Sequence, residues 1–264
     1  MPHRTSFVHT KGGTGKTTAA VNVAGFLSRK DQHVLLVDGD PEGHATRNLG
    51  LEPERLEDSL HELLLSGVGK KDNGWRDCVY PTAYGIDVVP GSRDLHDTYI
   101  ELSGENALQP SLERVEGRYD HVIIDAPSSY RHVVTEALKA AHDYFLVLDS
   151  SIFSQQGGQT LKSFLKKLPN RHEVRVNPTK ALYLEKVDKG PLKRLKEGLF
   201  GPGEGEAERI ARGVFGDRLT KLPYCSEVVR SQSEGRPLSH FENVPKEARV
   251  YEQLAEDLIE YSWR

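Results

Sequence analysis

A glycine-rich loop between an apolar segment and a helix start is the feature that most constrains this chain. Residues 6–18 read Ser-Phe-Val-His-Thr-Lys-Gly-Gly-Thr-Gly-Lys-Thr-Thr. Glycines carry no Cβ atom, so the backbone N–H groups of such a loop can approach phosphate oxygens closely. The N-terminus of the following helix adds a partial positive charge. The pattern predicts a polyphosphate cradle made by Gly12, Gly13, Thr14, Gly15, Lys16, Thr17 and Thr18.

The loop departs from the common Gly-x-x-x-x-Gly-Lys-Thr pattern in its first position. Thr10 stands where the first glycine belongs, and Lys11 precedes the glycines instead. Lys-Gly-Gly-Thr-Gly-Lys-Thr-Thr resembles the deviant Walker A loop of the ParA/MinD group of ATPases. We therefore expect ATP and Mg²⁺ as cofactors, with Lys16 at the β- and γ-phosphates and Thr17 at the metal. The resemblance implies that Lys11 crosses a dimer interface to the nucleotide of the other subunit.

Length and composition favour a single domain over residues 1–264, because α/β folds of this size commonly remain undivided. Cys78 and Cys225 are too few for a disulfide framework or a Cys-x-x-Cys metal site, so we expect packing roles in a reducing cytoplasm. The strand-like apolar run at residues 144–148 is far too short to cross a bilayer. The sequence therefore predicts a soluble protein.

Short apolar runs alternate with helical stretches along most of the chain. Several runs are continuously apolar, which is typical of strands covered on both faces in a largely parallel sheet. We expect a three-layer α/β/α P-loop NTPase fold. The predicted strands are residues 5–9, 33–38, 86–90, 119–125, 144–149, 180–186 and 218–222. The predicted helices include residues 16–30, 131–141 and 159–168.

Two carboxylates follow the second predicted strand. Residues 37–46 read Val-Asp-Gly-Asp-Pro-Glu-Gly-His-Ala-Thr and resemble the Asp-x-Asp-Pro-Gln-Gly-Asn-x-Thr segment of the ParA group. Carboxylates this close repel each other unless a cation or ordered water lies between them. By resemblance, Asp40 orients the attacking water and Asp38 supports the magnesium region. We interpret His44 as a surface or capping histidine.

A third acidic position ends the strand of residues 119–125, which reads Tyr-Asp-His-Val-Ile-Ile-Asp and continues into Ala-Pro-Ser-Ser. This stretch resembles the Walker B strand and following switch of the same group. Asp125 is therefore expected to hold a water on Mg²⁺, and the Ala-Pro-Ser-Ser turn to sense the γ-phosphate.

Residues 222–238 resemble the family stretch whose loop packs the adenine and whose helix faces DNA. Pro223 and Tyr224 are the predicted adenine contacts, although Tyr224 replaces the family's arginine. Residues 201–205, Gly-Pro-Gly-Glu-Gly, are interpreted as a surface insertion.

The net charge of −4 is unevenly distributed. Residues 151–237 hold 17 Lys and Arg against 10 Asp and Glu, a local charge of +7, which leaves −11 for the rest. Such a segment can mark a nucleic-acid surface, although clustered Lys and Arg more commonly form a solvated helix face. The DNA-contact candidates, which flank the last strands and the helix after Pro223, are Lys193, Arg194, Arg212, Arg218, Lys221 and Arg230.

Sequence features separate the roles found within the group. The membrane-bound division regulators end in a basic amphipathic helix, whereas residues 246–264 are acidic, so we expect no membrane partner. The iron–sulfur reductase needs cysteines in loops near the nucleotide, which Cys78 and Cys225 do not provide. The first strand begins at once, so the chain is expected to resemble the short ParA-like partition ATPases.

The resemblance then implies an ATP-bound homodimer that grips nonspecific DNA, placing the cytoplasmic protein on the nucleoid. A ParB-like or cargo-adaptor activator is expected to stimulate hydrolysis. The alternatives are a MinD-like positioning regulator, a P-loop enzyme that uses ATP to activate a small molecule, and a switch with negligible turnover.

Overall fold

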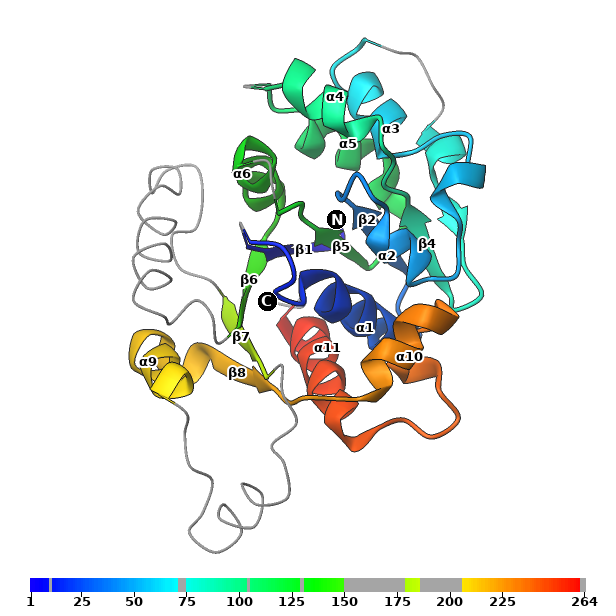
Figure 1. Cartoon of the computed structure of the whole chain (residues 1–264). Coiled ribbons are helices and arrows are strands. Elements are labelled where there is room, and N and C mark those ends of the chain that lie inside the picture. The colour runs from blue at the N-terminus through cyan, green and yellow to red at the C-terminus, as the bar shows by residue number, and fades with distance from the viewer. Residues whose placement is uncertain are drawn as a thin grey trace, which may run out of the picture.

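A twisted sheet runs through the centre of the molecule (Figure 1). The computed structural model describes residues 1–9, 11–70, 75–103, 105–128, 131–149, 179–185 and 206–261. Within these residues eight strands form one sheet in the order β3-β4-β2-β5-β1-β6-β7-β8, and only the pairing of β3 with β4 is antiparallel. The strands are β1 (His3–Val8), β2 (Val34–Asp38), β3 (Tyr80–Pro81), β4 (Ile86–Val89), β5 (His121–Asp125), β6 (Asp143–Asp149), β7 (Lys180–Leu184) and β8 (Leu219–Leu222).

The central strands are apolar throughout because both of their faces are covered. In β6, Leu146 and Leu148 belong to one hydrophobic core, while Phe145 and Val147 belong to a second core on the other face. Successive side chains of a strand point to opposite faces, so a continuous apolar run supplies both cores. Phe7 of β1 pairs with Phe145 in register, and their rings meet edge to face at 5.2 Å.

Helices on the two faces of the sheet complete three layers. One face carries α1 and α11, which pack against each other beside α10, and the other carries α3, α4, α5 and α6 (Figure 1). The helices are α1 (Lys16–Ser28), α2 (His44–Arg47), α3 (Leu60–Gly67), α4 (Leu95–Glu101), α5 (Leu108–Val115), α6 (Arg131–Ala140), α9 (Glu206–Phe215), α10 (Glu227–Glu234) and α11 (Arg249–Tyr261).

The predicted α/β/α fold is confirmed, with differences at element boundaries. The first strand begins at His3 rather than Thr5 because β1 continues its pairing with β5 to that residue. The predicted strand of residues 180–186 ends at Leu184 within the described residues. The predicted helix of residues 159–168 and the predicted insertion at residues 201–205 lie outside the described residues. The single-domain assignment stays a prediction.

The C-terminal helix α11 packs its apolar side chains against the core. Tyr251, Leu254 and Leu258 of α11 are buried in the core that α1 shares. Cys78 and Cys225 are buried thiols outside any disulfide, which agrees with packing roles. None of the described helices combines the length and the apolar character that crossing a bilayer requires.

The amino-terminal end of the sheet buries a histidine that makes the fold sensitive to acid. His121 is fully buried, and burial together with nearby His3 lowers its pKa to about 4. The unfolded chain binds this proton near pH 6.5, so stability falls as the pH drops from 6.5 to 4, by about 3 kcal/mol in full.

We expect His121→Gln to resist acid better than the wild-type chain, because the glutamine does not titrate. The free energy of unfolding, measured in urea at pH 7.5 and pH 5, should fall less in the variant. His33→Gln, at an exposed position, is the control and should lose as much as the wild type. Equal losses in all three proteins would contradict this prediction.

Candidate functional site

A cavity of about 580 Å³ opens at the carboxyl ends of β1, β2 and β5. Ligands of parallel α/β sheets bind at this end, because the loops that follow the strands converge there. Its wall is formed by the glycine-rich loop, the first turn of α1, the turn after β2 and the segment after β5. Single residues of α2, α4 and α10 complete it. These lining residues include Gly12, Gly13, Thr14, Gly15, Lys16, Thr17, Thr18, Asp40, His44, His96, Pro127, Ser128 and Gln232.

Two positions of the glycine-rich loop have a backbone conformation that favours glycine. Gly13 and Gly15 have φ values of +71° and +93°, in the left-handed region that side chains disfavour. A Cβ atom at Gly15 would also lie 2.7 Å from Cδ2 of Leu184 at the end of β7. The buried ring of His9 accepts the Lys11 N–H through Nδ1 at 2.8 Å, which holds the first residue of the loop.

Lys16 carries a buried positive charge into the cavity. The side chain is 7 % exposed, and Nζ donates a hydrogen bond to the Lys11 carbonyl at 3.4 Å. Burial lowers the pKa of Lys16, and the charges of Asp125 and Asp40 offset part of this effect. A buried ammonium with one long hydrogen bond is suited to an anionic ligand, because phosphate oxygens can satisfy its remaining donors.

Asp125 and Asp38 lie side by side because they are register partners at the ends of the parallel strands β5 and β2. Burial, followed by the charge of Asp38, raises the pKa of Asp125 to about 7, although Lys16 and the Thr17 hydroxyl work against this rise. Neither carboxylate oxygen of Asp125 accepts a hydrogen bond of ordinary geometry from the described residues. A buried carboxylate in this condition fits hydrated Mg²⁺, whose waters donate hydrogen bonds and whose charge favours ionisation.

Asp38 is held by the protein itself. One oxygen accepts the Asp40 N–H at 3.1 Å, and the other accepts the N–H and hydroxyl of Thr46 at 2.8 and 2.7 Å. Burial nevertheless raises its pKa to about 6. These bonds fix the turn that carries Asp40, so the metal role expected for Asp38 stays a prediction while its structural role is visible.

Asp40 and Glu42 are carboxylates that line the cavity, and Asp40 is held by its own turn. Its Oδ1 accepts the Glu42 N–H at 3.0 Å, and its Oδ2 lies 2.8 Å from Nδ1 of His44. Proline and glycine after Asp40 turn the chain back on itself, which brings residue 44 within reach of residue 40. A partly exposed carboxylate beside a phosphate-sized cavity is placed to orient a water molecule.

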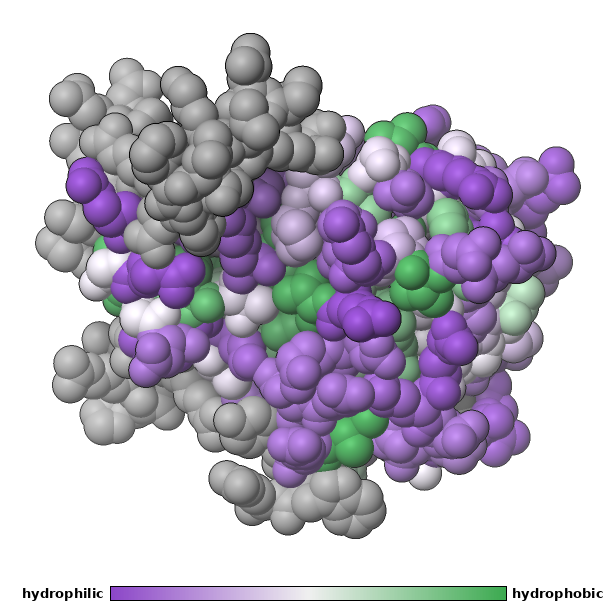
Figure 2. Space-filling model, turned by 90° about the horizontal axis from the view of Figure 1, so that it is seen from below, coloured by the Kyte–Doolittle hydropathy of each residue, from purple (hydrophilic) through white to green (hydrophobic). Residues whose placement is uncertain are grey.

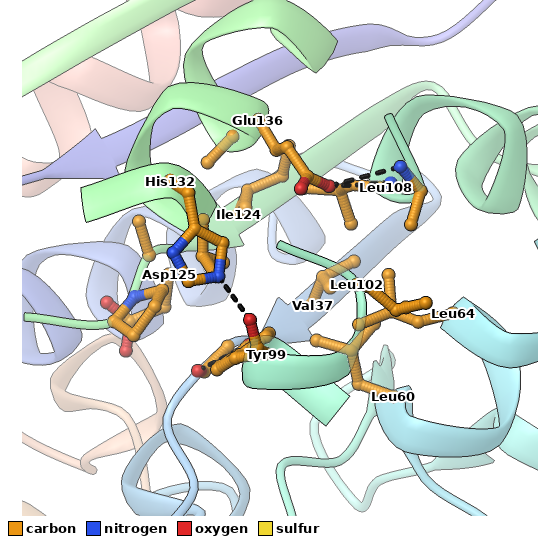
Figure 3. Close-up of a pocket in the computed structure, with 16 residues that line it drawn as sticks. Val37, Leu60, Leu64, Tyr99, Leu102, Leu108, Ile124, Asp125, His132 and Glu136 are labelled. Atoms are coloured by element: carbon orange, nitrogen blue, oxygen red, sulfur yellow. Dashed lines mark hydrogen bonds between the residues drawn. The ribbon is translucent and has the colours of Figure 1, made fainter. Parts of the chain in front are cut away.

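Behind this cavity lies a second, apolar one, shown in Figure 3, which is large enough for a single water molecule at about 20 Å³. Ala126 and Pro127 line both cavities. The buried Tyr99 hydroxyl donates to the carbonyl of Gly39 at 2.8 Å, and Nε2 of His132 is hydrogen-bonded to the Tyr99 carbonyl. The peptide between Asp38 and Asp40 is thereby anchored to α4.

The sequence and structure of this chain match those of ATPases along nearly their whole lengths. The model of an AAA domain family matches residues 3–177. The chromosome-partitioning ATPase Soj of Thermus thermophilus is 30% identical over 97% of this chain and 95% of its own. The MinD structure from Pyrococcus horikoshii with Mg-ADP superimposes with a TM-score of 0.73 over 99% and 98% of the chains, at 22% identity. The chain is a ParA/MinD-type P-loop ATPase.

This ParA/MinD-type ATPase hydrolyses ATP and takes ATP and Mg²⁺ as its ligands, as the glycine-rich loop predicted. A further likeness is to a structure named cobyrinic acid a,c-diamide synthase, from Mycobacterium smegmatis with ADP and magnesium, with 25% identity and a TM-score of 0.71 over 99% and 95% of the chains. Lys16 and the loop N–H groups are the groups that would hold the phosphates, with Thr17 and Asp125 beside the metal.

The adenine contacts of the ATPase are less clearly placed. Pro223 and Tyr224 follow β8, and Tyr224 is 38 % exposed. The residues that line the phosphate cavity do not include either of them, so their role stays a prediction. Gln232 of α10, for which the sequence suggested no role, does line the cavity, and its Nε2 donates to the Thr18 hydroxyl at 3.2 Å.

The basic candidates of the ATPase do not share one environment. Lys221 bonds Glu208 at 2.9 Å and Glu185 at 3.0 Å, and Arg212 bonds Glu208 at 3.2 Å. Arg230 is exposed on α10, pairs with Glu234 at 2.6 Å and lies over the ring of Phe241. Arg218 lies just before β8, and Lys193 and Arg194 lie outside the described residues.

Proposed function

We propose that this ATPase dimerises when it binds ATP, with Lys11 of each subunit contacting the nucleotide of the other. The observation that carries the proposal is the contrast between the two lysines of one loop. Lys16 is buried in the cavity, whereas the exposed Lys11 side chain does not line it. A lysine beside a phosphate loop but outside its cavity suits contact with phosphates from a second molecule.

We expect Lys11→Ala to keep most of its ATP affinity while losing dimerisation and turnover. The alanine removes no group from the cavity of its own subunit, so calorimetric ATP affinity should change less than about threefold. Light scattering with ATP and Mg²⁺ should show a monomer where the wild type forms a dimer. A normal ATP-induced dimer in this variant would refute the role of Lys11.

We propose further that the ATP-bound dimer binds DNA nonspecifically and positions or partitions DNA or another cargo. Relatives named as chromosome-partitioning proteins support this proposal, as does the local charge of +7 over residues 151–237. The described part of the face in Figure 2 is largely hydrophilic, with small separate apolar areas. A ParB-like protein or cargo adaptor is proposed to stimulate hydrolysis.

Arg230 is an exposed DNA-contact candidate on α10, so we expect Arg230→Ala to weaken DNA binding evenly across sequences. Contact with phosphate carries no sequence information, and each lost contact should make the log–log salt slope shallower by about one unit. Duplex binding by the ATP-bound protein is measured by anisotropy between 50 and 200 mM salt. Lys70→Ala, at a position paired with Glu101, is the control and should leave the slope unchanged.

The second candidate function is ATP-dependent activation of a small molecule, favoured by the likeness to the structure named a diamide synthase. The two functions differ in what accelerates phosphate release. Nonspecific duplex DNA, alone or with a DNA-bound activator, should accelerate release by a partition ATPase. Acceleration only by a carboxylic acid substrate and an amine donor would support the synthetase instead.

A further inference from the structure

The carboxylate of Asp40 is held on both sides by its own turn. Oδ1 accepts the Glu42 N–H, and Oδ2 is bonded to the ring of His44. An ionised carboxylate only accepts hydrogen bonds, so Nδ1 of His44 carries the proton in this pair. The two bonds restrain the side-chain torsions of Asp40, which an exposed aspartate would otherwise sample freely.

The turn that supplies His44 is itself closely packed. Gly43 has a φ of +64°, and its N–H donates to the Asp40 carbonyl at 2.9 Å. A Cβ atom there would lie 2.5 Å from Cγ of Pro53 and 3.2 Å from the Gly91 carbonyl. The first residue of α2 is therefore fixed at the position from which its ring reaches Asp40.

The charges around His44 favour its protonated ring. Partial burial opposes the charged form, but the hydrogen bond to Asp40 and the charges of Asp40, Asp38 and Glu42 outweigh burial and raise the pKa of His44 above its usual value. Among the described residues, the other charged or titratable groups at this cavity and its rim include Lys16, Arg47 with its partner Glu54, Arg93, His96 and Asp125.

We propose that His44 is a positioning residue for ATP hydrolysis, which holds the Asp40 carboxylate in the orientation that directs the attacking water at the γ-phosphate. This rests on the role assigned to Asp40. The imidazolium makes a charge-assisted hydrogen bond, which is about twice as strong as the bond that a neutral ring donates. His44 exchanges no proton with the substrate in this role.

Two substitutions separate the hydrogen bond from the titration. His44→Ala removes both, whereas His44→Asn places an amide N–H near the position of Nδ1 and does not titrate. We expect His44→Ala to lower kcat about tenfold, with KM for MgATP changed less than twofold, since misdirected water affects the chemical step. His44→Asn should recover at least half of the wild-type kcat at pH 8.

The dependence of kcat on pH tests the positioning role, because a purely structural role of His44 would leave it unchanged. The wild-type kcat should decline as the pH rises through the pKa of His44, and His44→Asn should lack this decline. His33→Asn is the matched control, because His33 pairs with Asp120 at 3.2 Å at the amino-terminal ends of β2 and β5, away from the cavity. This control should keep the wild-type profile.

The proposal is overturned if His44→Ala keeps the wild-type kcat, or if the decline persists in His44→Asn. Circular dichroism of each variant identifies a folding defect, and a folded His44→Asn still decides the question through its pH profile. Asp40→Asn tests the role of Asp40 separately from that of His44. Normal ATP hydrolysis by Asp40→Asn would refute the role of Asp40. Normal hydrolysis by His44→Ala, with Asp40→Asn impaired, would refute the role of His44 alone.

Discussion

Lys16→Ala is expected to abolish ATP binding at micromolar nucleotide. The ammonium is the buried positive charge of the phosphate cavity, and its loss leaves the β- and γ-phosphate charge without that partner. Charge-assisted hydrogen bonds to phosphate contribute about 1.5–3 kcal/mol each, so the loss of one bond to the β- and one to the γ-phosphate should lower affinity roughly 10²- to 10⁴-fold. Isothermal calorimetry with ATP and Mg²⁺ measures this loss.

The nucleotide-free form of Lys16→Ala should remain folded, because removing a buried charge also removes its desolvation cost. Thermal unfolding followed by circular dichroism verifies this. Lys11→Ala is the paired variant, since it changes a lysine of the same loop outside the cavity and should bind ATP. Unchanged calorimetric affinity in Lys16→Ala would refute the assignment of the phosphate site.

Asp40→Ala is expected to slow hydrolysis by at least about 10²-fold while ATP and Mg²⁺ remain bound. A residue that orients water lowers the energy of the transition state more than that of the ground state. Phosphate release measures the rate, and calorimetry measures binding. The ATP-bound dimer should accumulate in this variant, which light scattering detects.

Asp120→Ala is the control for this experiment, because Asp120 pairs with a histidine as Asp40 does, at 3.2 Å, far from the cavity. It should hydrolyse ATP at the wild-type rate. Normal hydrolysis by Asp40→Ala would show that another group orients the water and that Asp40 serves only its turn.

The glycine-rich loop stands out in the sequence because its chemistry is local. Close approach of a backbone to phosphate requires glycines, and Gly13 and Gly15 adopt the left-handed conformation that explains them. The pairing of Asp38 with Asp125 was also predictable in outline, since both end buried strands. That β2 lies beside β5, with these two residues in register, depends on the order of strands in the sheet, and no local sequence pattern encodes that order.

Other features depended on tertiary structure and escaped prediction. The strand β3 covers only Tyr80 and Pro81 at the sheet edge, which is too short to show alternation. Gln232 lines the cavity because α10 packs beside the first turn of α1, 214 residues away in sequence. The adenine contacts stay predictions for the same reason, since a loop distant in sequence must complete that wall.

The packing of α10 against the turn after α2 has a mechanical consequence. A Cβ atom at Gly235 would lie 2.7 Å from Cα of Gly50 and 2.8 Å from the Arg47 carbonyl, so the two backbones touch. Close-packed backbones cannot absorb displacement by compression. Any displacement of residues 47–50 would therefore be passed to the end of α10, the helix that carries Arg230.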